Sequence, residues 1–201
     1  YEMFLGPLEQ FKPWDVKGIN GVHNFLRKFW RLVHDTENNF SVSDETPTKD
    51  NYKTLHKTIK KVEEEIERYS FNTVVSTFMI CINELTEQKC SNRAIISDFT
   101  ILLSSYAPHI SEEVWSKLGN ENSVTMAIFP TFNSSYLVEN EVNYPVSFNG
   151  KMRFKITLPA EMTKEQVEVE VMKHEKTAHY LEGKSPKKII VVPKRIVNIV
   201  M

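Results

Sequence analysis

Two histidines near the end of the chain, His174 and His179, have the spacing closest to a zinc motif. A zinc pair on a helix has its histidines four residues apart, because that spacing puts both rings on one face. His174 and His179 are five residues apart, so their rings diverge on a helix. The sequence therefore predicts no metal site, and we expect no cofactor in this chain.

A catalytic centre is equally absent from the sequence pattern. His109 follows Pro108 without a combination of serine, cysteine and aspartate around it that would make it a catalytic base. The acidic cluster of residues 63–67 fits a solvated helix face better than a pair of catalytic carboxylates, and no glycine-rich phosphate loop is present. We therefore predict no catalytic residues in this chain.

The chemistry that remains is the binding of anions by regularly spaced cations. Lys151, Arg153 and Lys155 alternate with apolar residues after Asn149-Gly150, the dipeptide most typical of a tight β-hairpin. Side chains alternate between the faces of a strand, so we expect these three cations on one face, away from the core. Such a row suits a phosphate backbone. The tail also carries Lys184, Lys187, Lys188, Lys194 and Arg195, and no acidic residue follows Lys184.

A second group of cations lies on a predicted helix that starts near Gly21. Apolar residues recur at helical spacing from Val22 to Val33, which indicates a core-facing stripe. Arg27, Lys28 and Arg31 share the polar face of this helix. They are either a solvated surface or phosphate contacts, and the sequence leaves both interpretations open. The aromatics of an RRM are missing, so we expect recognition of shape and phosphate rather than of bases.

A helical bundle over the first two-thirds of the chain must position this second group. Residues 55–85 carry two apolar runs at spacings of three and four, which predicts a helical hairpin with one buried face. We expect Asn72 to cap its second helix. The candidate caps of two further helices are Ser91 or Asn92 for the third and Ser111 for the fourth, with Gly119 as the stop of the fourth.

The hydrophobic period changes to two in the last part of the chain. After the strands around Asn149-Gly150, Thr163 and Gln166 form a capping box for a helix through Lys173. A short helical piece and two apolar runs at 189–192 and 196–200 follow. The predicted fold is mainly α, an antiparallel helical bundle followed by a small α+β domain of order ββααββ. Its expected parts are a linker at 1–18, the bundle at 19–119, a second linker at 120–141 and the small domain at 142–201.

Charge is distributed unevenly along the 201 residues, although the formal net charge is only −1. Residues 142–201 contain 11 Lys and Arg against 6 Asp and Glu, whereas residues 1–141 contain 14 against 20. A basic tail of this kind indicates a polyanionic partner. The two cysteines, Cys81 and Cys90, fit reduced thiols of a cytoplasmic protein. We expect no membrane segment and no signal peptide, and Tyr1 begins what looks like a piece of a longer chain.

Several motifs, taken in order, resemble the C-terminal region of bacterial leucyl-tRNA synthetases, which are class I enzymes. The stretches YEMFLGPLEQ (1–10) and KPW (12–14) resemble the segment after the KMSKS signature, and VHNFLRKFWRL (22–32) resembles the first helix of the anticodon-binding bundle. HKTI (56–59), FNT (71–73) and APHISEEVW (107–115) are similar to its next landmarks. NGKMRFKI (149–156), IVVPK (190–194) and IV (199–200) resemble the extreme C-terminal domain of the leucyl enzymes.

This resemblance implies a parent enzyme that joins leucine to its tRNA with ATP, and with Mg expected. The HIGH and KMSKS motifs and the editing domain would lie before Tyr1, so this chain would dock tRNA(Leu) without activating leucine. The resemblance implies as partners tRNA(Leu) and the upstream catalytic and editing domains, in a cytoplasmic monomer without membrane contact.

Two alternatives remain. In the first alternative, the chain is a structural or protein-interaction module whose basic tail contacts an acidic partner. In the second, it is the same region of a valyl or isoleucyl relative. The small basic domain argues against the second alternative, because those families typically end in a coiled coil or a zinc-bearing segment.

Overall fold

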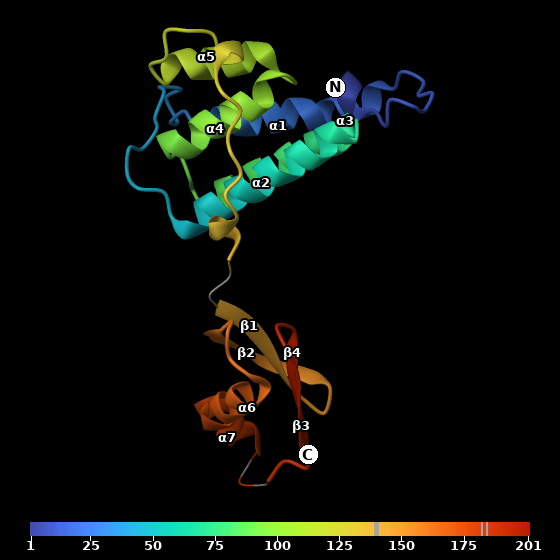
Figure 1. Ribbon diagram of the computed structural model, residues 1–201, viewed down its shortest axis with the longest axis vertical. Coiled ribbons are helices and arrows are strands. Elements are labelled where there is room, and N and C mark those ends of the chain that lie inside the picture. The colour runs from blue at the N-terminus through green and yellow to red at the C-terminus, as the bar shows by residue number, and fades with distance from the viewer. Residues whose placement is uncertain (139–140, 182, 184) are drawn as a thin grey trace. The chain divides into compact units, whose positions relative to one another are not determined.

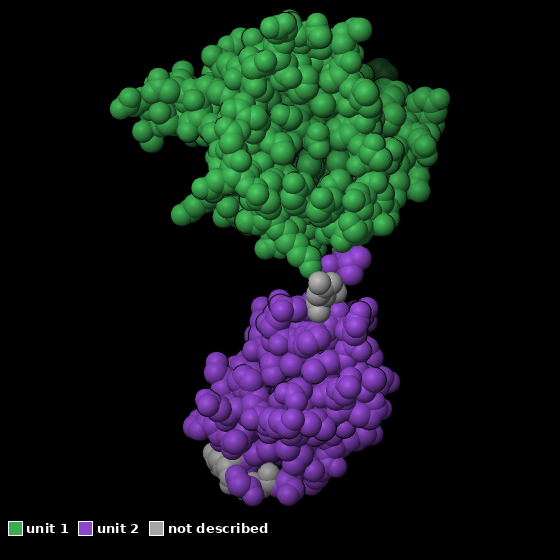
Figure 2. Space-filling model, turned by 60° about the vertical axis from the view of Figure 1, so that its left-hand side comes forward, with its two compact units in different colours: residues 1–137 green, residues 138–201 purple. Residues whose placement is uncertain are grey.

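The computed structural model describes residues 1–138, 141–181, 183 and 185–201. The chain divides into two compact units, residues 1–137 and residues 138–201 (Figure 2). Each unit has a hydrophobic core of its own. Lys184, one of the cations of the predicted basic tail, lies outside the described residues.

The first unit is a bundle of α-helices joined by loops and short 3₁₀ segments (Figure 1). Its α-helices are α1 (Ile19–Leu32), α2 (Lys49–Glu67), α3 (Phe71–Glu87), α4 (Arg93–Ser104) and α5 (Pro108–Lys117). The 3₁₀ segments are η1 (Glu2–Phe4), η2 (Val16–Gly18), η3 (Val124–Met126) and η4 (Ser134–Leu137). Residues 120–137, expected as part of a linker, belong to this unit, and Val124 is buried in it.

The predicted helical hairpin is formed by α2 and α3, which lie side by side (Figure 1). Ile59 and Val62 of α2 and Phe78 and Ile82 of α3 are all fully buried, so both apolar stripes face the core. The helices are separated by Arg68, Tyr69 and Ser70, and the φ of 56° at Tyr69 breaks the helical path. Burial of each such side chain contributes about 1.5–3 kcal/mol, so the hairpin is held by its packed face.

The predicted helix caps are confirmed only in part. Asn92 caps α4, because its side chain accepts a hydrogen bond from the N–H of Ala94. Asn72 is not a cap, since α3 already begins at Phe71. Ser111 is not a cap either: α5 starts three residues earlier, at Pro108, and Ser111 is buried within it. Proline suits the first position of a helix because its fixed φ is already helical and its missing N–H would have no partner there.

The second unit confirms the predicted order ββααββ. Its elements are β1 (Glu141–Phe148), β2 (Lys151–Pro159), α6 (Lys164–Lys173), α7 (Glu175–Leu181), β3 (Lys188–Val192) and β4 (Ile196–Val200). The strand order in the sheet is β2-β1-β4-β3, so the two hairpins meet where β1 runs parallel to β4. The helices α6 and α7 pack on one face of the sheet, where Val167, Val171 and Leu181 join its core (Figure 1).

The turn at Asn149-Gly150 forms as predicted. Asn149 and Gly150 have φ values of 47° and 81°, the left-handed pair that a tight two-residue hairpin requires. The last strand fastens this turn, because Gly150 donates its N–H to Asn198 Oδ1 and Met201 donates its N–H to Asn149 Oδ1, each at 3.0 Å. The capping box of Thr163 and Gln166 is also present.

Candidate nucleic-acid interface

A β-bulge interrupts the row of cations on β2. Val146 of β1 pairs with Phe154, but the next residue, Ser147, pairs with Met152, so Arg153 has no partner in the register. A bulge of this kind shifts the alternation of side chains by one residue on the bulged strand. Met152, expected on the apolar face, is accordingly 56% exposed.

The bulge separates the three cations onto different faces of the sheet. The Arg153 guanidinium lies 5.3 Å from the ring centre of Tyr180 on α7, a cation–π contact on the face that the helices cover. Lys151 pairs with Phe148, whose ring also contacts Tyr180. Lys155 instead pairs with Pro145, on the opposite face from Phe154. The prediction that Lys151, Arg153 and Lys155 share one face is therefore wrong, although all three are exposed.

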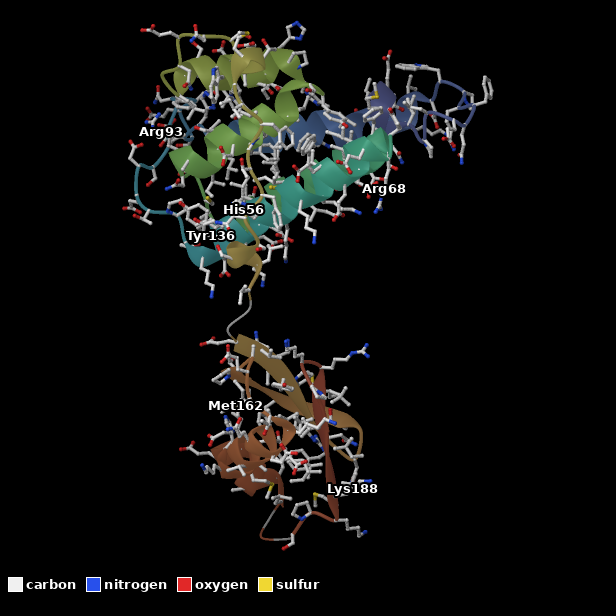
Figure 3. All side chains as sticks on the ribbon, in the orientation of Figure 1. His56, Arg68, Arg93, Tyr136, Met162 and Lys188 are labelled. Carbon is white, nitrogen blue, oxygen red and sulfur yellow. The ribbon has the colours of Figure 1, made fainter. Side chains whose placement is uncertain are left out.

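The described cations after Lys184 form two groups at opposite ends of the β3–β4 hairpin. Lys187 and Lys188 stand at the start of β3, beside the C-terminal end of β4, where Lys187 donates its N–H to the carbonyl of Val200 (Figure 3 labels Lys188). Lys194 and Arg195 occupy the turn between the strands, about 17 Å away at about 3.3 Å per residue. The first group lies at the same end of the sheet as Lys151, because the Asn149-Gly150 turn also meets the end of β4.

A buried tyrosine shapes the turn that carries Lys194. Lys194 has a φ of 58°, and its backbone N–H donates to the hydroxyl of Tyr144 at 2.9 Å. Tyr144 belongs to β1 and is 2% exposed, so this hydrogen bond ties the basic turn to the centre of the sheet. The backbone of this basic turn is thus anchored to a residue of the core.

In the first unit, Arg27, Lys28 and Arg31 converge on one groove of about 570 Å³. They project from α1 toward the C-terminal end of α3, where Lys89 adds a fourth cation to the same lining. Lys28 is held in place by its hydrogen bond to Asn83 Oδ1 at 2.6 Å. Four basic side chains in one concave surface form a site for a polyanion.

One acidic side chain, Asp35, also lines the groove. Its carboxylate accepts the backbone N–H groups of Asn39 at 2.8 Å and Glu37 at 2.9 Å. The hydrogen bonds from Asn39 and Glu37 hold the pKa of Asp35 below its usual value, so it is ionised at neutral pH. Because its oxygens already accept these bonds, Asp35 organises its own loop, and the four cations dominate the charge of the groove.

His174, His179, Cys81 and Cys90, which were considered above as candidate metal ligands or thiols, pack against other side chains or lie buried. His174 stacks on Phe154 with ring centres 4.8 Å apart, while His179 meets the edge of Tyr180. Cys81 and Cys90 are both buried, and burial raises the pKa of the Cys81 thiol to about 12. Within the described residues, no group of three or more histidine, cysteine, aspartate or glutamate side chains is placed to hold a metal ion, and no helix is both long and apolar enough to cross a membrane.

The chain has counterparts among protein families, curated proteins and solved structures. The family model described as the anticodon-binding domain of tRNA ligase matches residues 49–170. The chain belongs to this family. Among curated relatives, the leucine–tRNA ligase of Christiangramia forsetii is 61% identical over 200 residues, and that of Cytophaga hutchinsonii is 58% identical over 201. These alignments cover the whole chain but only 21% and 22% of the relatives, so the chain spans about a fifth of their length.

A solved structure resembles this chain over nearly its full length. It is a LeuRS of Agrobacterium radiobacter K84 in a ternary complex with tRNA and LeuAMS, 25% identical with a TM-score of 0.64. The similarity covers 98% of this chain and 28% of that one. The resemblance to leucyl-tRNA synthetases that the motifs indicated is thereby confirmed, and it is favoured over the valyl or isoleucyl alternative.

Proposed function

We propose that this chain is the tRNA-docking region of a leucine–tRNA ligase. It positions tRNA(Leu) for ATP-dependent charging by catalytic and editing domains outside these 201 residues. ATP and Mg act in those domains, and we expect a cytoplasmic monomer. The similarity to leucine–tRNA ligases and to a LeuRS solved with tRNA supports this function.

The observation that carries the proposal is the groove lined by Arg27, Lys28, Arg31 and Lys89. Three of its cations come from α1 and the fourth from the turn that follows α3, and all four line a common space. This arrangement suits successive phosphates of an RNA backbone. Contacts to phosphate orient the RNA without reading its sequence. This agrees with a docking role in which the identity of the tRNA is not read by the groove.

The second unit would add phosphate contacts at separate points. Lys151, Lys187 and Lys188 gather at one end of the sheet, and Lys194 and Arg195 lie at the other. Lys155 lies on the face without helices. We propose that these groups touch different parts of the RNA, in contrast to the single track that the sequence pattern predicted.

Titration of the chain with tRNA(Leu) over a range of salt concentrations tests the proposal. For wild type, log K should fall linearly with log salt, and each lost phosphate contact should reduce the slope by about 0.7–0.9. The double variant Arg27→Glu/Lys89→Glu should bind more weakly and lose roughly two such contacts.

Lys49→Glu is the matched control in the same unit. Lys49 is exposed in the first turn of α2, where a negative charge is favourable to the helix, and it lies outside the groove. Equal binding by the groove variant and this control would contradict the proposed groove. No binding by the wild-type chain at low salt would instead favour a protein-interaction module with an acidic partner.

A further inference from the structure

An aromatic cluster fixes the stretch of chain that leaves the first unit. The ring of Tyr136, in η4, stacks against two side chains of α2, with centres 4.4 Å from Tyr52 and 4.5 Å from His56 (Figure 3 labels His56 and Tyr136). The interplanar angles are 17° and 9°, so the three rings are nearly parallel. Phe132 meets His56 edge-on, and Lys60 lies 5.7 Å from the Phe132 ring centre. We name Tyr52, His56, Lys60, Phe132 and Tyr136 the aromatic clamp.

A hydrogen bond sets the position of the clamped segment along α2. Asn133 donates its backbone N–H to Nδ1 of His56 at 3.3 Å, which requires a neutral ring with its proton on Nε2. The Asn133 side chain in turn accepts the N–H of Ser135 at 3.0 Å, so the turn into η4 is ordered by the same residue. His56 is 7% exposed and therefore makes these contacts away from bulk water.

The clamp lies immediately before the second unit in the chain. Leu137 ends η4 and Glu141 begins β1, so three residues lie between the clamped segment and the sheet. We propose that the aromatic clamp is a positioning device that keeps the connection between the units this short and so allows both units to engage one tRNA. The inference rests on the proposed function in its assumption that the RNA contacts both units.

The size of the effect follows from chain length. With the clamp in place, three residues separate Leu137 from Glu141. Loss of the Tyr136 ring releases residues 133–137, so the last fixed residue becomes Phe132 and eight residues separate it from Glu141. Five further residues extend the reach of the chain by about 17 Å at most. The effective concentration of a tethered module falls roughly as the 3/2 power of tether length, which gives about a four-fold loss.

The experiment compares Tyr136→Ala with Tyr136→Phe in the chain of residues 1–201. Spin labels on cysteines introduced at Glu67 and Lys164, both exposed, report the distance between the units. Tyr136→Ala should extend the upper end of the distance distribution by up to about 17 Å and speed hydrogen exchange at the Asn133 amide. Tyr136→Phe keeps the stacked ring and should restore both to wild-type values.

Binding to tRNA(Leu) is measured on the same variants. Tyr136→Ala should weaken binding about four-fold, and Tyr136→Phe should bind like wild type. Unchanged distances in Tyr136→Ala, or unchanged affinity despite longer distances, would overturn the inference. If wild type itself does not bind tRNA, the proposed function fails, whereas unchanged distances alongside normal wild-type binding reject only the clamp.

Discussion

The register between α2 and α3 depends on a ladder of polar groups that can be tested with one isosteric substitution. Thr54, 4% exposed, donates its hydroxyl to Glu84 Oε2 at 2.8 Å and accepts an N–H of Gln88 at 2.9 Å. Gln88 in turn accepts a hydrogen bond from Asn51 at 2.8 Å. Thr54→Val preserves the shape of the side chain and removes both of its hydrogen bonds to α3.

The expected cost of Thr54→Val is about 2 kcal/mol in the free energy of unfolding. A neutral hydrogen bond contributes about 1 kcal/mol and one to a carboxylate about 1.5–3 kcal/mol. Glu84 and Gln88 are only half-buried, so water can hydrogen-bond to both side chains after the threonine hydroxyl is removed. The expected cost therefore lies below the sum of the two hydrogen-bond contributions. In a unit of this size the melting temperature should fall by roughly 6–8 °C.

Urea unfolding followed by tryptophan fluorescence measures this effect in the first unit alone. The tryptophans Trp14, Trp30 and Trp115 all lie in residues 1–137, so the signal is insensitive to the second unit. Thr77→Val is the matched control on α3, because the Thr77 hydroxyl donates only to the carbonyl of Thr73 in its own helix and its loss should cost less than about 0.5 kcal/mol. Equal stability of the two variants would refute the assignment of the ladder as a register device.

Three further predictions concern the sheet, the clamp and the turn. Lys155→Glu and Arg153→Glu should each weaken tRNA(Leu) binding, and the two effects should add in the double variant. Only Arg153→Glu should also destabilise the second unit, because it loses the contact with Tyr180. Non-additive effects on binding in the double variant would contradict the placement of the two cations on different faces of the sheet. Burial lowers the pKa of His56, so its contribution to stability should be complete above about pH 6.5 and be lost as the pH falls through the lower pKa of the folded state. Hydrogen exchange at the Asn133 amide, corrected for intrinsic rates, measures this loss of stability. If the pH dependence of the exchange rate were the same in His56→Gln as in wild type, the assignment of the effect to His56 would be wrong. Gly150→Ala should destabilise the second unit by about 1 kcal/mol in thermal unfolding, because the φ of 81° strains alanine even though space is open there. Gly21→Ala is the control: Gly21 lies in the helical backbone of α1, so its replacement should not destabilise the chain.

The elements of this fold were predictable because they depend on local patterns. The spacing of Ile59 and Val62, and of Phe78 and Ile82, is sufficient to indicate two helices with buried faces. The Asn149-Gly150 turn and the Thr163 capping box are signals contained within four residues. The cap assignments at Asn72 and Ser111 were wrong because neither helix starts with a side-chain cap: Ser70 makes no capping hydrogen bond, and α5 begins with Pro108 after Ala107.

The site was predictable only as a list of residue types. Alternation placed Lys151, Arg153 and Lys155 on one face, since nothing in the sequence of β2 marks the extra residue of the bulge. A bulge is a property of the pairing of two strands, here of Ser147 opposite Met152. The stacking of Arg153 on Tyr180 joins residues 27 positions apart in the sequence and could not be inferred from either segment alone.

Two features of the first unit, the basic groove and the aromatic clamp, also depend on residues far apart in the sequence and could not be predicted. Lys89 joins Arg27 in the groove across 62 positions of sequence, and Tyr136 stacks on His56 across 80. Each pair joins an element recognised as helix to a stretch that appeared to be a connection. A polar connection rich in turn signals is normally a surface loop. The aromatic residues Phe132 and Tyr136 within it were the available signal, because large aromatic side chains in a connection usually find apolar surface to cover.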